Sequence, residues 1–304
     1  MTSLRPCYTF QTLMSNILIT GCSMGIGFAT ALELARAGHR VIATMRNPAG
    51  APRLGQFAAE ENLPIEIRAL DVDSDESVRS CFSAIEAPID VLVNNAGIEV
   101  HGSVEELSME SFIAVMDTNY FGTVRCIKAV LPRMRERRSG CVINISSISG
   151  RMSSAPLGAY AASKHAVEAM SEALAGEVKP FGIRVAIVEP GIQNTRMAQD
   201  ISCSNGSLYP HSVRLAGLFR ESLSSPTPPE ATASVVRHII ESGTWQLRHL
   251  SGPDAAPYLA WRAGQSDEQW VDWNAQDDES WYAAVERDFG LNARPLPAAR
   301  TGMD

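Results

Sequence analysis

Residues 20–27 read TGCSMGIG, and this stretch decides the fold. It follows the apolar run Ile17–Thr20 and precedes a long amphipathic stretch, so its glycines lie in a turn between a strand and a helix. Such a turn brings backbone N–H groups and a helix N-terminus close to a pyrophosphate. The sequence therefore predicts a dinucleotide-binding turn. Its contact residues are expected to be Gly21, Ser23, Met24, Gly25, Ile26 and Gly27.

Outward from this turn, short apolar runs alternate with longer amphipathic stretches, a pattern typical of βαβ units. The runs are apolar throughout, which fits central strands of a parallel sheet with helices on both faces. We therefore predict a single α/β domain with a doubly wound parallel sheet. The predicted strands are residues 17–20, 40–43, 65–70, 91–93, 141–145 and 184–188.

Helices are predicted between these strands from their apolar periodicity and end signals. The first runs over 25–37 and stops at Gly38, which adopts a left-handed cap without strain. A second starts at a capping box formed by Asp73 and Glu76. A third starts after Ser108 and continues past Pro132 only with a kink, leaving 133–138 as a solvated end. Two more are expected over 160–178 and 231–240.

Composition and charge exclude several classes of protein. The 304 residues carry 26 Lys and Arg against 34 Asp and Glu, and a net charge of −8 argues against a nucleic-acid partner. No apolar run reaches the ~20 residues of a membrane span. The six cysteines have neither CxxC spacing nor a histidine pattern, so neither a metal site nor disulfides are expected. A cytoplasmic protein is predicted.

Three segments lie outside the regular alternation. Residues 1–13 lack the features of a signal peptide and are predicted to be an N-terminal extension capable of disorder, so that the domain spans 14–255. Residues 196–229 are irregular and are expected to form a mobile substrate lid. The acidic tail 256–304 holds four of the five tryptophans. We expect this tail to pack on the domain or on a partner subunit, with substrate gating as the alternative.

The motifs along this chain resemble those of the classical short-chain dehydrogenase/reductases, a family with a Rossmann-type fold. The family's TGxxxGxG turn matches residues 20–27, and its NNAG, serine and YxxxK elements match 94–97, 145–147 and 160–164. Its helix asparagine matches Asn119, and its PGxxxT element matches 190–195. The resemblance covers about residues 16–195. The wording ATMR at 43–46, NYFGT at 119–123 and LPRM at 131–134 resembles the branch of 17β-hydroxysteroid and retinol dehydrogenases.

The resemblance implies the catalytic residues. Tyr160 is the acid/base, and Lys164 lowers its pKa and bonds the nicotinamide ribose. Their spacing of four residues places both side chains on one face of a helix. Ser147 is expected to orient the substrate carbonyl, in preference to Ser146, because the family's serine lies thirteen residues before the tyrosine. Asn119 is expected to hold a water of a proton relay.

The cofactor expected from the resemblance is NADP(H) rather than NAD(H). Met45 stands where NAD-preferring members place an aspartate, and the adjacent Arg46 can bind a 2′-phosphate, assisted by Ser23. The alternative is that Arg46 is a solvated loop charge. Asp71 and Val72 match the pair that holds the adenine. The other cofactor contacts implied are Asn95, Ala96, Gly97, Tyr160, Lys164, Pro190, Gly191, Ile192 and Thr195.

The predicted function is the interconversion of a ketone or aldehyde with an alcohol by hydride transfer, on a bulky apolar small molecule. Substrate contacts are expected from Ser147, Met152, Leu157, Tyr160, Met197, Tyr209, Leu218 and Phe219. The family also implies a homodimer or homotetramer, paired through the helices that follow Ser108 and Ala159.

Two other classes remain open at this point. One is a redox-inactive regulator that binds NADP, which has no need of the set Asn119, Ser147, Tyr160 and Lys164. The other is an epimerase or dehydratase of the extended branch. That branch carries TGxxGxxG, whereas Gly21, Gly25 and Gly27 have the classical spacing.

Overall fold

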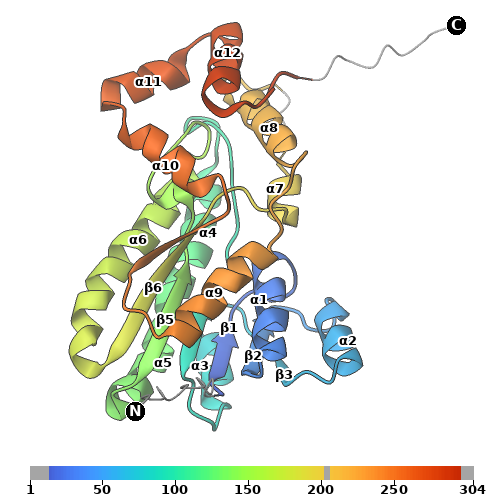
Figure 1. The fold of residues 1–304 in the computed structure, drawn as a ribbon, viewed down its shortest axis with the longest axis vertical. Helices are drawn as coiled ribbons and strands as arrows, with labels where there is room; N and C mark the ends of the chain where they lie inside the picture. The colour runs from blue at the N-terminus through green and yellow to red at the C-terminus, as the bar shows by residue number, and fades with distance from the viewer. Residues whose placement is uncertain (1–13, 202–205, 296–304) are drawn as a thin grey trace, which may run out of the picture.

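A computed structural model describes residues 14–201 and 206–295, so the expectation for residues 1–13 lies outside it. These residues form one sheet of seven parallel strands in the order β3-β2-β1-β4-β5-β6-β7, with helices on both faces (Figure 1). The fold class predicted from the sequence is confirmed. The strands are β1 (Asn16–Ile19), β2 (Arg40–Met45), β3 (Ile65–Ala69), β4 (Val91–Asn94), β5 (Gly140–Ile145), β6 (Ile183–Pro190) and β7 (Arg248–Ser251).

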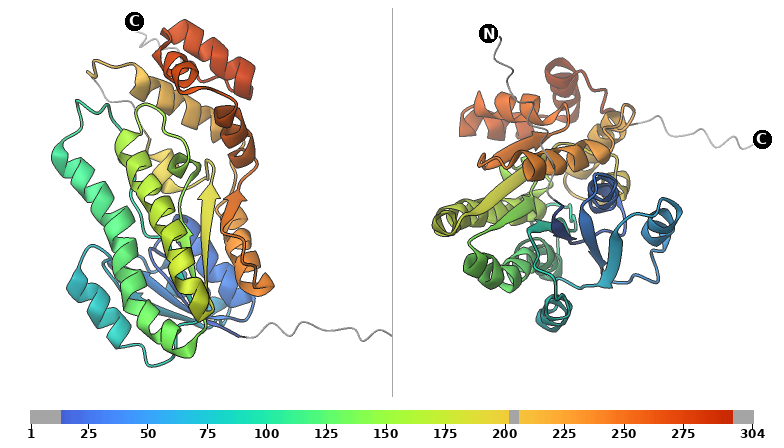
Figure 2. Two further views of the ribbon diagram at one scale, coloured as in Figure 1. Left: turned by 90° about the vertical axis from the view of Figure 1, so that its left-hand side faces the viewer. Right: turned by 60° about the horizontal axis from the view of Figure 1, so that its bottom comes forward.

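Both faces of the sheet are apolar because alternate residues of each strand face opposite helical layers. In β1, Ile17 and Ile19 pack into one core, and Leu18 packs into the other. The first core is covered by α1 (Gly25–Arg36), α2 (Arg53–Glu60) and α9 (Glu230–Ser242). The second is covered by α3 (Asp75–Ser83), α5 (Gly122–Arg137) and α6 (Gly158–Val178). The layers are seen edge-on in Figure 2.

The six predicted strands are all present with small changes at their ends, whereas β7 and α2 were not predicted. β7 is an edge strand of sequence RHLS, in which only His249 and Ser251 are buried. It therefore lacks the apolar run by which the central strands are recognised. α2 has eight residues and one buried side chain, Leu54, too few for a clear helical period.

The predicted capping box of α3 is wrong. The cap is Ser74, whose hydroxyl accepts a hydrogen bond from the Ser77 N–H at 3.2 Å. Asp73 lies one residue earlier and accepts a hydrogen bond from Thr118 Oγ1 at 3.0 Å. Its carboxylate is thus used in a tertiary contact, which the local spacing could not reveal.

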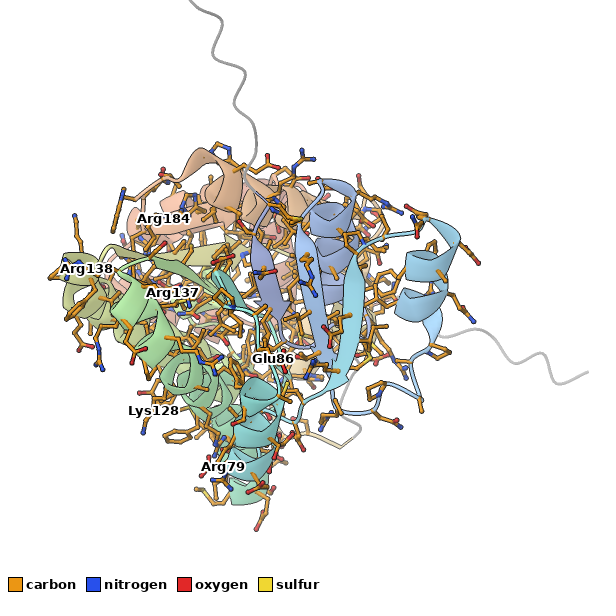
Figure 3. All side chains as sticks on the ribbon, turned by 90° about the horizontal axis from the view of Figure 1, so that it is seen from below. Arg79, Glu86, Lys128, Arg137, Arg138 and Arg184 are labelled. Atoms are coloured by element: carbon orange, nitrogen blue, oxygen red, sulfur yellow. The ribbon has the colours of Figure 1, made fainter. Side chains whose placement is uncertain are left out.

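One helical path runs from α4 (Met109–Met116) through a π-helical turn, η1 (Asp117–Phe121), into α5. α5 continues through Pro132 and ends at Arg138, which adopts a left-handed conformation with φ 52°. The end of this helix is only partly solvated, because Arg137 and Arg138 donate hydrogen bonds to the carbonyls of Ile89 and Pro180. Figure 3 shows these arginines at the end of the molecule seen from below.

The segment 196–229 contains regular structure, contrary to expectation. It forms α7 (Arg196–Gln199) and α8 (His211–Ser222). Four of the twelve residues of α8 are buried: Ser212, Arg214, Leu215 and Gly217. Three of these are polar or lack a side chain, and this hides the helical period in the sequence.

The C-terminal cap, as we name α10 (Ala255–Ala263), α11 (Asp267–Ala275) and α12 (Asp278–Phe289), lies at one end of the sheet (Figure 1). It packs on the rest of the fold through Tyr258 and Trp270, which contact a cluster containing Ile148 and Met152. The Trp270 indole N–H donates to the Ser153 carbonyl at 3.0 Å. Contacts within the chain therefore hold the tryptophan-rich tail.

Within the described ranges, none of the helices combines the length and apolarity needed to cross a membrane. The cysteines among these residues, Cys22, Cys81, Cys126 and Cys141, are buried and form no disulfide. Burial raises the pKa of the Cys141 thiol to about 11, so it stays protonated at neutral pH.

Arg214 joins α8 to the C-terminal cap, and replacing it with alanine is expected to destabilise the protein. Its side chain is 4% exposed and bonds the Asp278 carboxylate and the backbone carbonyls of Asn274 and Gln276. Losing these bonds should lower the free energy of unfolding by about 2 kcal/mol, measured by urea denaturation. Arg79→Ala, which breaks an exposed pair with Glu76, is the control and should cost less than about 1 kcal/mol. Equal losses would contradict the assignment.

Candidate active site

A cavity of about 690 Å³ opens at the carboxyl ends of the strands, between the glycine turn and the C-terminal cap. It brings together most of the residues that the sequence singled out. The predicted residues that line it are Gly21, Ser23, Met24, Gly25, Ile26, Arg46, Asp71, Val72, Asn95, Ala96, Gly97, Ser147, Met152, Leu157, Tyr160, Lys164, Pro190, Gly191, Ile192, Thr195, Met197, Leu218 and Phe219.

The glycine turn is held against the end of β4 by side-chain hydrogen bonds. The Thr20 hydroxyl accepts from the backbone N–H groups of Asn95 and Ala96 at 3.0 and 2.9 Å. The Asn95 amide donates to the carbonyls of Thr20 and Gly21 at 2.8 and 3.0 Å. Asn95 was predicted as a cofactor contact. In this structure its amide also fixes the shape of the turn.

Gly27 does not line the cavity but lies directly behind the turn. A Cβ atom there would come within 2.3 Å of Asn95 Nδ2 and 2.5 Å of the Gly21 carbonyl oxygen. Gly21 itself has φ +72°, in the left-handed region that favours glycine. Both positions therefore require glycine for the turn to close.

The N-terminus of α1 faces the cavity without a side-chain cap. Its cap residue, Met24, has an extended backbone and makes no capping hydrogen bond. The first N–H groups of a helix need acceptors, and an anionic phosphate group can supply them. The uncapped helix end and the glycine cradle therefore fit a dinucleotide.

Arg46 follows β2 and lies on the same side of the cavity as Ser23 and Asp71. It is exposed, and within the described ranges its guanidinium makes no hydrogen bond or ion pair. The Asp71 carboxylate accepts a hydrogen bond from the Asp73 N–H, and the Asp71 N–H donates to Ser77 Oγ. This end of the cavity thus presents one unpaired cation beside an ordered acidic loop.

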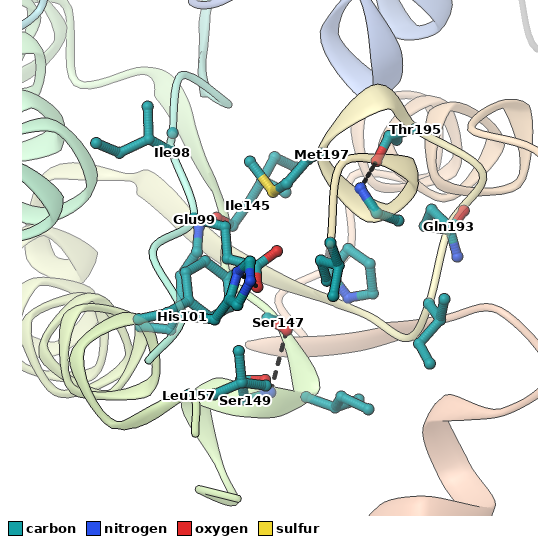
Figure 4. Close-up of a pocket in the computed structure, with 18 of the residues that line it drawn as sticks. Ile98, Glu99, His101, Ile145, Ser147, Ser149, Leu157, Gln193, Thr195 and Met197 are labelled. Atoms are coloured by element: carbon teal, nitrogen blue, oxygen red, sulfur yellow. Dashed lines mark hydrogen bonds and ion pairs between the residues drawn. The ribbon is translucent and has the colours of Figure 1, made fainter. Parts of the chain in front are cut away.

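Tyr160, Ser147 and Lys164 meet in the middle of the cavity. Tyr160 and Lys164 lie on α6, and Ser147 follows β5, where its hydroxyl accepts from the Ser149 N–H at 3.1 Å (Figure 4). The Lys164 ammonium lies 5.7 Å from the centre of the Tyr160 ring and donates to the Ile145 carbonyl at 2.9 Å. The predicted constellation is thus assembled around one space.

Burial dominates the electrostatics of this constellation. It raises the pKa of Tyr160 above its ordinary value, the charge of Glu99 raises it further, and a hydrogen bond with Ser147 opposes both. Burial also lowers the pKa of Lys164 to about 8, against a raising effect of Glu168. The net shift of the Tyr160 pKa is upward because burial is its largest cause, and the lowering expected from Lys164 stays a prediction.

Besides Gly27, two predicted residues do not line the cavity, namely Asn119 and Tyr209. Asn119 is buried in η1. Its side-chain amide accepts a hydrogen bond from the Ile98 N–H, donates to the Ile98 carbonyl, and donates to Ser163 Oγ at 2.9 Å. It therefore anchors the segment after β4. Tyr209 does not line the cavity, because its hydroxyl donates to the Glu105 carboxylate at the surface. The sequence could not show this long-range pairing.

The structure adds an aromatic wall that was not predicted as part of the site. It comes from the C-terminal cap, and Trp270 and Trp273 are stacked in it at 5.6 Å with an interplanar angle of 4°. The wall consists of Tyr258, Trp261, Trp270, Trp273, Trp281 and Phe289, all of which line the cavity. The concentration of tryptophans in the tail was the available signal. It was assigned to packing, whereas these side chains both pack and line the site.

Glu99 and His101 are two further lining residues that the sequence did not indicate (Figure 4). The side chain of Glu99 is 8% exposed, and its Oε1 atom lies 3.8 Å from His101 Nδ1. Burial raises the pKa of Glu99 to about 7. No motif predicts this carboxyl group, because its burial results from tertiary packing.

The uncapped helix, the glycine cradle and the Tyr160–Lys164 pair line one cavity of an α/β fold, and this lining fits a dinucleotide. A family model described as short chain dehydrogenase matches residues 15–205, and the chain belongs to that family. Human retinol dehydrogenase 8 is 45% identical over 180 residues, which is 58% of each chain. Curated relatives of 44 to 45% identity are matched over 58 to 65% of their own length.

Solved structures resemble this chain over most of its length. A short-chain dehydrogenase from Streptomyces avermitilis has a TM-score of 0.73 at 34% identity, covering 86% of this chain and 97% of that one. An actinorhodin polyketide ketoreductase with NADPH has a TM-score of 0.68 at 30% identity, covering 79% and 97%. The chain is therefore a member of the short-chain dehydrogenase family and resembles its branch of retinol dehydrogenases.

Glu99→Gln is expected to stabilise the protein in a pH-dependent way. The native carboxyl group keeps its proton up to about pH 7, whereas in the unfolded chain it loses the proton near its ordinary pKa of 4.5. Stability therefore falls as pH rises between these values, by up to about 3 kcal/mol. In urea denaturation, Glu99→Gln should gain about this amount over the wild type at about pH 8 and little at about pH 5. The control Glu86→Gln changes an exposed carboxylate. A gain for Glu99→Gln that does not change with pH would contradict the burial of an unpaired carboxyl group.

Proposed function

We propose that this protein is an NADP(H)-dependent oxidoreductase that interconverts a bulky, apolar ketone or aldehyde with its alcohol. The observation that carries the proposal is one continuous cavity lined by the uncapped end of α1, by Arg46, by Tyr160 with Ser147 and Lys164, and by the aromatic wall. The cavity can thus hold a dinucleotide beside an apolar substrate, with the Tyr160 phenol between them.

The glycine turn and the first N–H groups of α1 would hold the pyrophosphate, and Lys164 would bond the ribose next to the nicotinamide. When bound, the nicotinamide supplies or accepts the hydride. Arg46 would bind the 2′-phosphate of NADP(H), because a planar, permanently charged fork matches phosphate oxygens. Support for NADP(H) comes from the unpaired guanidinium and from a solved relative that contains NADPH.

Tyr160 would give its proton to the substrate oxygen during reduction and take it back during oxidation. Ser147 would orient the same oxygen through its hydroxyl group. The Tyr160 phenol is neutral at neutral pH, and burial raises its pKa further, so it carries the proton that a reduction needs. The positive charge of the Lys164 ammonium would stabilise the phenolate that Tyr160 becomes when it gives up its proton.

The proposal includes a bulky apolar substrate and a paired chain. The aromatic wall, Met152 and Leu157 give the cavity an apolar lining. Three apolar side chains along α4 and η1 are exposed: Met109, Ile113 four residues later, and Phe121 eight residues after that. An apolar stripe of this kind supports a homodimer that pairs through this helix.

Tyr160→Phe removes only the hydroxyl group and should reduce kcat by roughly 10²- to 10⁴-fold, the usual contribution of a general acid. NADPH binding, measured by the fluorescence of the reduced cofactor, should be unchanged. Tyr209→Phe makes the same exchange outside the cavity and should keep its turnover. Full NADPH-linked turnover by Tyr160→Phe would refute the proposed acid.

Arg46→Ala should remove most of the preference for NADPH over NADH. A charge-assisted bond to phosphate is worth about 1.5–3 kcal/mol, so the ratio of kcat/KM for the two cofactors should fall at least tenfold. Arg40→Ala, at the opposite end of β2, is the matched control. Equal use of both cofactors by the wild type would exclude the role assigned to Arg46.

A further inference from the structure

The cavity contains a buried carboxyl group that the proposed chemistry does not use. Glu99 lies five residues after the end of β4, in a segment whose backbone is anchored by Asn119 at Ile98. Its side chain is 8% exposed, lines the cavity, and has an Oε1 atom with no hydrogen-bond partner among the described residues. A buried oxygen without a donor is costly, so its place in a ligand cavity calls for a reason.

Among the described residues, Glu99 has no salt bridge as short as a hydrogen bond. His101 Nδ1 is 3.8 Å away, which is too long for a hydrogen bond. The Lys164 ammonium donates to the Ile145 carbonyl instead. In the part of the chain that the structure describes, no arginine or lysine forms an ion pair with Glu99. The acceptor atoms of this carboxyl group are therefore available to a ligand.

Glu99 lies close to the reacting group and not at the end of the cavity where Arg46 is found. Glu99, Tyr160 and Ser147 line the same cavity, and the charge of Glu99 raises the pKa of the Tyr160 phenol. Figure 4 shows the Glu99 and His101 side chains beside each other within the pocket, on the side where Ser147 lies. A group bound by Glu99 would therefore sit next to the carbonyl that Ser147 and Tyr160 bind.

We infer that Glu99 is a specificity-determining residue that accepts a hydrogen bond from a hydroxyl or protonated amine next to the substrate carbonyl. His101 Nδ1 lies 3.8 Å from its Oε1 atom. This inference rests on the proposed function and deepens it. In its ionised form this carboxyl group has only acceptor atoms, and a bound hydrogen-bond donor or cation favours that form. A site with a buried polar group rejects analogues that leave it unpaired.

The inference narrows the substrate class. The aromatic wall accepts a bulky apolar body, and Glu99 accepts one donor group near the reacting carbon. The substrate is therefore an amphiphile, a hydroxy-ketone or amino-ketone, or the corresponding diol or amino alcohol. A purely hydrocarbon ketone fits the wall but leaves the carboxyl group unpaired.

The test compares three phenyl ketones that differ beside the carbonyl: α-hydroxy-, α-methoxy- and α-(dimethylamino)acetophenone. The methoxy compound has nearly the same shape as the hydroxy compound but has no donor. With NADPH, the wild type should reduce the hydroxy compound with a kcat/KM at least about tenfold above that of the methoxy compound. The amine arm, run where the amine is protonated, shows whether a charged donor is preferred to a neutral one.

Two substitutions separate the charge of Glu99 from its acceptor atoms. Glu99→Leu should abolish the preference for both donors and raise turnover of the methoxy compound relative to the hydroxy compound. Glu99→Gln keeps one acceptor oxygen, so it should keep part of the hydroxyl preference and lose any amine preference. Glu86→Gln, an exposed carboxylate before β4, is the matched control and should keep the wild-type ratios.

Binding gives a readout that does not need turnover. The hydroxy compound should raise the melting temperature of the NADPH complex more than the methoxy compound does, in the wild type and not in Glu99→Leu. Equal shifts and equal kcat/KM ratios in both proteins would overturn the inference while leaving the oxidoreductase proposal intact. Selective shifts without reduction of any ketone would instead support the Glu99 site and count against the proposed function. Unfolding curves show whether each variant is folded.

Discussion

The close contact between Gly27 and the Gly21 carbonyl, clamped by Asn95, is the constraint on which the site depends. It lets α1 begin immediately beside the end of β1, with its first N–H groups facing the cavity. Because the clamp reaches from β4, it also fixes the segment that carries Glu99 relative to the turn. The glycine turn and the segment that carries Glu99 are thus held by one set of contacts and not by separate loops.

Within that frame, burial sets the chemistry more strongly than any single partner. Tyr160, Lys164 and Glu99 all have pKa values shifted toward their neutral forms, and loss of hydration is the largest cause in each case. A cavity of this kind favours neutral groups until a ligand brings charge or hydrogen bonds. Spacing along α6 places Tyr160 and Lys164 together, but it does not by itself give an acidic phenol.

The parts that the sequence predicted are those with a local signal. The strands that are apolar on both faces, such as β5 and β6, are recognisable because each is buried between two layers. The glycine turn and the Tyr160–Lys164 pair are recognisable because their chemistry requires fixed spacing. β7, Tyr209 and the cap of α3 were missed or misassigned. β7 lacks the apolar run of a central strand, whereas Tyr209 and Asp73 form hydrogen bonds with residues far along the chain.

Apolar periodicity in the sequence predicted the doubly wound fold, and the resemblance of its motifs predicted the family and the residues around Tyr160. Only the tertiary structure decided that the tryptophans of the C-terminal cap form a wall of the cavity and that Glu99 is buried there without a partner. The reason is physical: burial and cavity shape are properties of surfaces brought together from distant segments. No local pattern of residues specifies them.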